Sequence, residues 1–189
     1  MDSIGTAAMK SVNGIDVAGL GAVVREIAED PAKGIIGFRV TSRWKGQTRS
    51  EATVESYSLG GHDLPRSFVI AADEPIELFG SNTAPNPQEL LMSAFNACIM
   101  VGYVAGAAVR GISLEKVEIE TSGELDLRGF LGLDERIKPG YEAMRTTVRI
   151  KGDGTPEQFA EIHETVRKTS PNWFNLSNPV AVEARLVVE

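Results

Sequence analysis

The sequence predicts an α+β fold, because strand-like and helix-like segments come in separate blocks along the chain. Apolar and polar residues alternate in several short neighbouring segments, which is typical of half-buried antiparallel strands. Two longer segments, 90–109 and 156–169, have the composition and boundary residues of helices. This order favours antiparallel sheets over a parallel, doubly wound sheet. With 189 residues, of which 42% are hydrophobic, the chain is long enough for one domain with a core.

A first helix is predicted over residues 15–29. Asp16 can cap its start, apolar residues recur within it at helical spacing, and the helix has to end before Pro31. We therefore expect residues 1–34 to form an N-terminal extension with one helix, and residues 35–189 to form the main domain.

Strands are predicted next. The alternation over residues 35–57 predicts a β-hairpin with its turn at 45–47, and residues 67–72 predict a further short strand. Residues 80–87 are of types that are typical of a loop.

The segment 90–109 holds twenty residues without a charge, and Gly111 supplies a C-cap after it. Its length would permit a membrane span, but Ser93 and Asn96 interrupt it and no basic cluster marks either end. A helix that is apolar all round is more simply one that is buried on every side. We therefore expect no membrane contact. Because one subunit of this size can hardly cover such a helix on every side, we expect a second subunit to cover it in a homodimer.

The second half of the chain predicts a strand pair, a helix and a last strand. Residues 115–124 and 144–151 alternate as paired strands, joined by an elaborated connection. The helix at 156–169 begins with a capping box that Thr155 opens. A final strand is predicted over Val180–Val188.

Charge and rare residues exclude several kinds of protein. The net charge of −7 comes from mixed acidic and basic residues, which offers no basic face to nucleic acid. A single cysteine excludes an intramolecular disulfide. His62 and His163 lack partners at metal-ligand spacing, so we expect no metal and no other cofactor. Residues 1–14 lack the basic start and apolar run of a signal peptide, so the cytoplasm is the expected location.

Several motifs resemble the signature of the OsmC/Ohr family (osmotically inducible protein C and organic hydroperoxide resistance protein). The resemblance covers about residues 35–189, and its motifs are Asp73-Glu74-Pro75, Ala84-Pro85-Asn86-Pro87-Gln88-Glu89-Leu90-Leu91, Ala94-Phe95-Asn96-Ala97-Cys98 and Ser170-Pro171. It implies antiparallel sheets wrapped around two central helices in an intertwined homodimer. It also implies a peroxidase. A peroxidatic cysteine becomes a sulfenic acid, a second cysteine resolves it as a disulfide, an external dithiol reduces the disulfide, and an arginine and a glutamate order the site.

Carried over residue by residue, the resemblance makes Cys98 the candidate peroxidatic cysteine. Ser170 occupies the place of the resolving cysteine, so an active protein would need an external thiol to resolve a sulfenic acid. The reacting species is the thiolate. The helix dipole does not favour a thiolate at Cys98, because Cys98 lies eleven residues past Pro87 and the dipole acts within about the first turn. A positive side chain must therefore lie close to the sulfur, and the candidates are Arg43, Lys45, Arg49 and Arg66.

The other candidates lie in the hairpin and in the first turn of the long helix. The family's arginine comes from the hairpin, where Arg43 and Arg49 are both available. The position of its glutamate holds Gln88, with Glu89 next to it. Both lie roughly 14 Å from Cys98 along a straight helix. They would therefore act by holding the arginine or by facing the partner subunit's cysteine.

Two main functions remain open, besides a third in which the dimer is a scaffold with no small-molecule role. The first is a thiol-dependent hydroperoxide reductase that uses Cys98 as its single peroxidatic cysteine, a small hydroperoxide as substrate and an external thiol as reductant. The alternative is a non-catalytic dimer that binds a small hydrophobic ligand, with Cys98 as a small buried apolar residue, as free cysteines usually are. The rate of Cys98 alkylation at neutral pH separates the two, because only an activated thiolate reacts fast.

Overall fold

The structure of the protein is a computed structural model that describes residues 11–189. The described residues divide into two compact units, a first that ends at Ser93 and a second that begins at Ala94. Both contain helices and antiparallel strands, so the predicted α+β class is confirmed. The expectation about a signal peptide falls mostly on residues 1–10, which lie outside the described residues, and the boundary at residue 34 stays a prediction.

The first unit begins with a very small hairpin that leads into a helix. Strands β1 (Ser11–Val12) and β2 (Ile15–Asp16) are joined by Asn13 and Gly14, whose φ angles of 53° and 80° suit an Asn-Gly turn. Helix α1 (Val17–Glu29) follows at once, and the Asp16 carboxylate accepts the backbone N–H of Gly19 at 3.0 Å. The predicted helix and its cap are confirmed. A short 3-10 helix, η1 (Pro31–Gly34), comes next.

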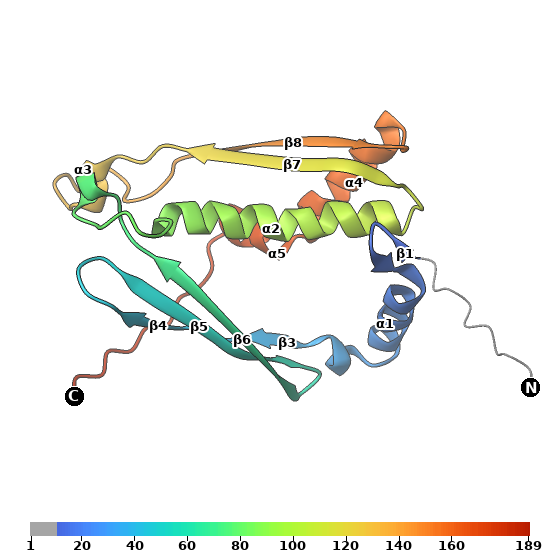
Figure 1. Cartoon of the computed structure of the whole chain (residues 1–189), viewed down its shortest axis with the longest axis horizontal. Helices are drawn as coiled ribbons and strands as arrows, with labels where there is room; N and C mark the ends of the chain where they lie inside the picture. Colours follow the sequence, from blue (N-terminus) through green and yellow to red (C-terminus); the bar gives the residue numbers. More distant parts are fainter. Residues whose placement is uncertain (1–10) are drawn as a thin grey trace, which may run out of the picture. The chain divides into compact units, whose positions relative to one another are not determined.

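The sheet of the first unit is built around one long strand (Figure 1). The four strands are β3 (Ile36–Phe38), β4 (Thr41–Trp44), β5 (Ser50–Leu59) and β6 (His62–Ala72). Strand β5 pairs with the other three, all antiparallel: β3 and β4 pair with successive parts of one edge, and β6 pairs along the other edge. The predicted hairpin is confirmed. Strand β6 begins at His62, well before the predicted residue 67, although it contains Pro65. The proline is tolerated because β6 pairs only with β5, so no partner on its free edge requires a backbone N–H at this position.

The long apolar helix is α2 (Pro87–Ala108), and it is continuous across residues 93 and 94. By length and composition α2 could cross a membrane, a criterion that core helices of soluble proteins also meet. In the second unit one face of α2 is buried in the core, at every fourth residue: Phe95, Ile99, Tyr103 and Ala107.

The second unit packs a two-stranded sheet and a helix against α2. Strands β7 (Leu114–Gly123) and β8 (Met144–Gly152) form an antiparallel pair, as predicted, and run alongside α2 in Figure 1. Helix α4 (Pro156–Thr169) has the predicted capping box and adds Ile162 and Val166 to the core. The connection between the strands contains one short helix, α3 (Leu127–Phe130).

The end of the chain contains one helix that the sequence pattern did not predict, and it lacks the strand that was predicted there. A further helix, α5 (Pro171–Ser177), follows α4 directly, with Ser170 as its cap and Pro171 at its first position. The strand predicted over Val180–Val188 is absent: residues 178–189 form neither helix nor strand. A strand needs a neighbouring strand for its backbone groups, and none of the described strands pairs with this segment.

Candidate functional site

The surroundings of Cys98 are set by a close approach of helices α2 and α4. A Cβ atom at Gly102 would lie 2.9 Å from Cγ2 of Val166, and one at Gly106 would lie 3.1 Å from Cγ2 of Ile162. Only the missing side chains of these glycines allow the two helices to come so close. Cys98 belongs to the same row of small residues on α2, four residues apart: Ala94, Cys98, Gly102 and Gly106.

This packing places Cys98 beside Ser170. The Cys98 Sγ and Ser170 Oγ atoms are 3.3 Å apart and either can be the donor; Cys98 is half-buried and Ser170 is 7% exposed. Ser170 Oγ also accepts the backbone N–H of Trp173 at 3.3 Å. Since the hydroxyl then has its hydrogen free, it can donate to the sulfur. The structure therefore brings together the two positions that the resemblance assigned to the reacting and resolving cysteines.

The start of α5, which carries this hydroxyl, is fastened to α2. The side-chain amide of Asn172 donates to the carbonyl of Ala94 at 2.9 Å. The rings of Trp173 and Phe95 are 5.6 Å apart, and the guanidinium of Arg167 lies over the Trp173 ring at 5.5 Å. These contacts hold Ser170 in place next to the sulfur.

A pair formed by the buried Tyr103 and the half-buried His163 lies one layer further along the same helices. The Tyr103 hydroxyl and Nδ1 of His163 are 2.5 Å apart. Burial raises the pKa of Tyr103 to about 12, so the phenol keeps its proton at neutral pH and is hydrogen-bonded to the imidazole as a neutral group. Neither residue of this pair was among the site residues that the sequence predicted. The one sequence signal for the pair was the spacing of Gly102 and Gly106. This spacing indicates that another helix packs closely against α2, but it does not say which helix.

The two arginines of the hairpin have different surroundings within the first unit. Arg43 donates to Thr53 Oγ1 at 3.3 Å. Arg49 closes the turn between β4 and β5, and its guanidinium makes no hydrogen bond or ion pair with the described residues of this unit. The pKa of Glu51 is lowered chiefly by Lys45, and to a smaller extent by the charge of Arg49. Arg49 is thus the arginine that is free to bind another group.

Glu89 is engaged in starting helix α2. Its Oε2 accepts the backbone N–H of Asn86 at 2.8 Å, and Asn86 Oδ1 accepts the backbone N–H of Glu89 at 2.8 Å. This reciprocal pair is a capping box, which accounts for an acidic residue at this position. Gln88 is exposed and its side chain has no hydrogen-bond partner among residues 11–93.

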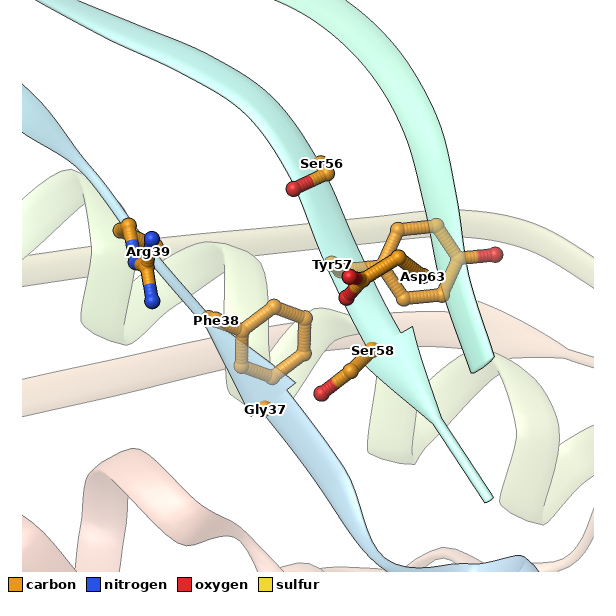
Figure 2. Close-up of a pocket in the computed structure, with 7 residues that line it drawn as sticks. All are labelled: Gly37, Phe38, Arg39, Ser56, Tyr57, Ser58 and Asp63. Carbon is orange, nitrogen blue, oxygen red and sulfur yellow. The ribbon is translucent and has the colours of Figure 1, made fainter. Parts of the chain in front are cut away.

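Figure 2 shows a polar pocket on the sheet of the first unit, and none of the predicted site residues lines it. Its volume is about 200 Å³. Gly37 keeps it open, because a Cβ there would lie 2.7 Å from Ser58 Oγ. The lining residues are Gly37, Phe38, Arg39, Ser56, Tyr57, Ser58 and Asp63. Within residues 11–189 no group of three His, Cys, Asp or Glu side chains is arranged to hold a metal ion.

Comparison with known proteins gives a consistent result. The family model described as OsmC-like protein matches residues 80–185, more than half of the chain. The uncharacterized protein YmaD of Bacillus subtilis is 22% identical over 131 residues, which are 69% of this chain and 78% of YmaD.

Two solved structures share the fold. An OsmC like protein from Mycoplasma pneumoniae has a TM-score of 0.58 at 16% identity, over 74% of this chain and 86% of its own. A putative osmotic stress induced and detoxification response protein from Psychrobacter arcticus has a TM-score of 0.55 at 14% identity, over 71% and 84%.

Proposed function

The chain belongs to the OsmC-like protein family, and we propose that it is a thiol-dependent hydroperoxide reductase in which Cys98 is the single reacting cysteine. The observation that carries the proposal is the contact of 3.3 Å between the half-buried Cys98 sulfur and the Ser170 hydroxyl. The contact puts Cys98 next to the position at which the family resemblance places the resolving cysteine, as expected for the family's reacting cysteine. The thiolate is the nucleophile that a peroxidase needs.

The proposed cycle uses one protein thiol and two external thiols. The Cys98 thiolate attacks one oxygen of the hydroperoxide, the O–O bond breaks, and the other oxygen leaves with a proton as an alcohol. Cys98 is then a sulfenic acid. One external thiol attacks its sulfur and releases water, and a second external thiol displaces Cys98 from the mixed disulfide. Because Ser170 cannot form a disulfide, the sulfenic acid must wait for the external thiol.

The test is consumption of cumene hydroperoxide by the full chain with dithiothreitol as reductant. Cys98→Ser should abolish the protein-dependent rate, and a dimedone adduct should form on Cys98 of the unchanged protein after one equivalent of hydroperoxide. Ser170→Ala keeps the sulfur but removes the donor, and should slow the reaction about tenfold, the effect of one hydrogen bond of roughly 1.4 kcal/mol. Equal turnover by the Cys98 variant would end the proposal.

One observation favours the second candidate, a non-catalytic protein that binds a small hydrophobic ligand. The row of small residues on α2 explains by packing alone why position 98 is small, because Gly102 and Gly106 of the same row both lie against α4. Among the described residues of the second unit, no Lys, Arg or His side chain makes a hydrogen bond to Cys98. In that case iodoacetamide would modify Cys98 no faster than free cysteine, and a bound apolar compound would be seen in native mass spectrometry.

We also propose that the protein is an intertwined homodimer. The sheet of the first unit exposes large apolar side chains, and the segment 178–189 exposes several more outside any strand: Ile36, Phe38, Trp44, Phe68, Ile70, Val182, Leu186 and Val188. Such an amount of exposed apolar surface favours association with a second subunit. Sedimentation equilibrium should give twice the 20.3 kDa of one chain, and a purely monomeric species at micromolar concentration would contradict this.

A further inference from the structure

Four polar side chains of the pocket in Figure 2 have no protein partner within the first unit. They belong to Arg39, Ser56, Ser58 and Asp63, and none of them makes a side-chain hydrogen bond or an ion pair with residues 11–93. In Figure 2 the two serine hydroxyls lie between the Arg39 side chain and the Asp63 carboxylate. A few polar groups that converge on one pocket without bonding to one another are typical of a site for a small ligand.

The strand pairing explains how these groups come together. Gly37 of β3 is the register partner of Ser58 on β5, and Ser58 is also the register partner of Asp63 on β6. These residues therefore form one row across three neighbouring strands, which lie about 4.8 Å apart in a sheet. Arg39, just past the end of β3, and Ser56 each lie two residues from this row, and alternation along a strand keeps them on the same face.

The size of the pocket limits what it can hold. A Cβ atom at Gly37 would lie 2.7 Å from Ser58 Oγ, so a side chain at this position would occupy the space. The volume of about 200 Å³ is room for about seven water molecules of roughly 30 Å³ each. It is below the roughly 300 Å³ at which pockets begin to hold drug-sized molecules. The ligand that fits is therefore a small one.

The opposite signs of the two charged groups select the class of ligand. The guanidinium of Arg39 offers a planar fork of N–H donors that matches a carboxylate, whereas the carboxylate of Asp63 can only accept and suits an ammonium group. A simple anion would be repelled by Asp63, and a simple cation would be repelled by Arg39. A molecule that carries both charges satisfies both groups.

We propose that this pocket binds a small zwitterion, an α-amino acid whose carboxylate lies against Arg39 and whose ammonium group lies against Asp63. The hydroxyls of Ser56 and Ser58 both donate and accept, so they can bond to either end of the ligand. Because Arg39 and Asp63 are exposed, water competes for both charges and the expected affinity is in the millimolar range. The site uses residues of the first unit only, so the inference is independent of the reaction proposed for Cys98.

The test titrates the full chain, isotope-labelled for NMR, with L-serine and with two molecules that each keep one of its charged groups. The first, β-hydroxypropionate, lacks the ammonium group, and the second, ethanolamine, lacks the carboxylate. Shifts of the backbone amides of Ser56, Ser58 and Asp63 report binding. We expect L-serine to shift these amides in the millimolar range, and we expect each of the other two to bind about tenfold more weakly, because one charge of the pocket then has no partner.

Two substitutions should each change which molecule binds best. Asp63→Asn should weaken the binding of L-serine about tenfold and make β-hydroxypropionate bind as well as L-serine, because the ammonium group has lost its partner. Arg39→Gln should do the same for ethanolamine, because the carboxylate has lost its partner. Glu55→Gln is the matched control. It removes an exposed carboxylate of the same sheet that lines a neighbouring hollow instead, and it should leave all three affinities unchanged.

The variants are suited to this comparison because the exposed side chains of Arg39 and Asp63 make no bonds that the first unit needs, and circular dichroism checks that each variant is folded. Equal binding of the three molecules overturns the proposal, and so does an effect of Glu55→Gln as large as that of Asp63→Asn. The absence of shifts at the pocket amides across the millimolar range of L-serine overturns it as well.

Discussion

Replacing Ser170 by cysteine should give the protein an internal disulfide that its own sequence excludes. In Ser170→Cys the new sulfur would stand where the hydroxyl oxygen lies, 3.3 Å from Cys98 Sγ. A C–S bond is longer than a C–O bond, so the two sulfurs would need to approach by roughly 1 Å to reach the disulfide length of about 2.05 Å. Rotation of one side chain supplies such a movement. Hydroperoxide should oxidise Cys98 to a sulfenic acid, and the new thiol should displace water from it.

The stability of the oxidised variant can be worked out from the loop that the bond closes. Residues 98 and 170 are 72 positions apart, and closing a loop of that length stabilises by about 4.4 kcal/mol in the chain-entropy description. The reduced variant loses the hydroxyl that caps α5 at Trp173, which costs roughly 1 kcal/mol. For a chain of this size each kcal/mol moves Tm by about 2–4 °C. We expect the oxidised form of the variant to melt about 9–18 °C above its reduced form.

The assay counts free thiols and records melting before and after one equivalent of hydroperoxide. The count should fall from two to zero in Ser170→Cys, and dithiothreitol should restore it. Thr169→Cys is the matched control, because its exposed side chain points to the carbonyl of Thr165 rather than to Cys98. If both thiols of the Ser170 variant stay reactive after oxidation, the contact between α2 and the start of α5 has been placed wrongly.

Three further predictions concern the groups around the site. Gly102→Ala should lower the free energy of unfolding by about 1–3 kcal/mol in urea titrations, because the new methyl group meets Val166. Tyr103→Phe should remove the stability that the unchanged protein loses between pH 10 and about 12, roughly 3 kcal/mol, because a raised pKa favours the folded state until the phenol ionises. The substitution also removes the hydrogen bond between Tyr103 and Nδ1 of His163. Burial alone would raise the pKa of Asp73, but the hydrogen bonds that its oxygens accept hold it well below its usual range. Asp73→Asn should be less stable at neutral pH, and the difference should shrink as pH falls below about 4, since the lowered pKa stabilises the folded state only while the carboxylate is ionised.

Two comparisons keep these predictions specific. Gly21→Ala, at a position of helix α1 where a Cβ meets only the flexible end of Arg25, should be neutral or slightly stabilising. A loss as large as that of Gly102→Ala would mean that helix packing is not the cause. For the two pH predictions, parallel stability curves of variant and unchanged protein across the stated range would contradict the assignment to Tyr103 or Asp73.

Elements that depend on neighbouring residues were predicted well. Asp16 caps α1 and the capping box of α4 opens at Thr155, because a cap needs only the next three residues of the chain. Strand β6 was predicted too short because Pro65 breaks the strand pattern, and only the pairing with β5 alone shows that this proline is tolerated.

For the site, the motif around Cys98 and the serine at position 170 were legible in the sequence, because a family signature is a local string of residues. The roles of Glu89 and Thr48 were not. A glutamate in a first turn is compatible with capping and with catalysis, and only its bonds to Asn86 show that it caps. A threonine in a polar turn has no distinguishing pattern, and its bond to Asp73 spans 25 residues of chain.

The sequence by itself determined that this is an α+β protein with one cysteine on a long apolar helix, since composition and short-range periodicity suffice for that. The tertiary structure alone decided that the Cys98 sulfur lies against the Ser170 hydroxyl, and that the alternating segment 180–188 is not a strand. Both results depend on contacts between residues far apart in the chain. Gly102 and Gly106 make the first possible by letting two helices touch, whereas a strand forms only where another strand offers its edge.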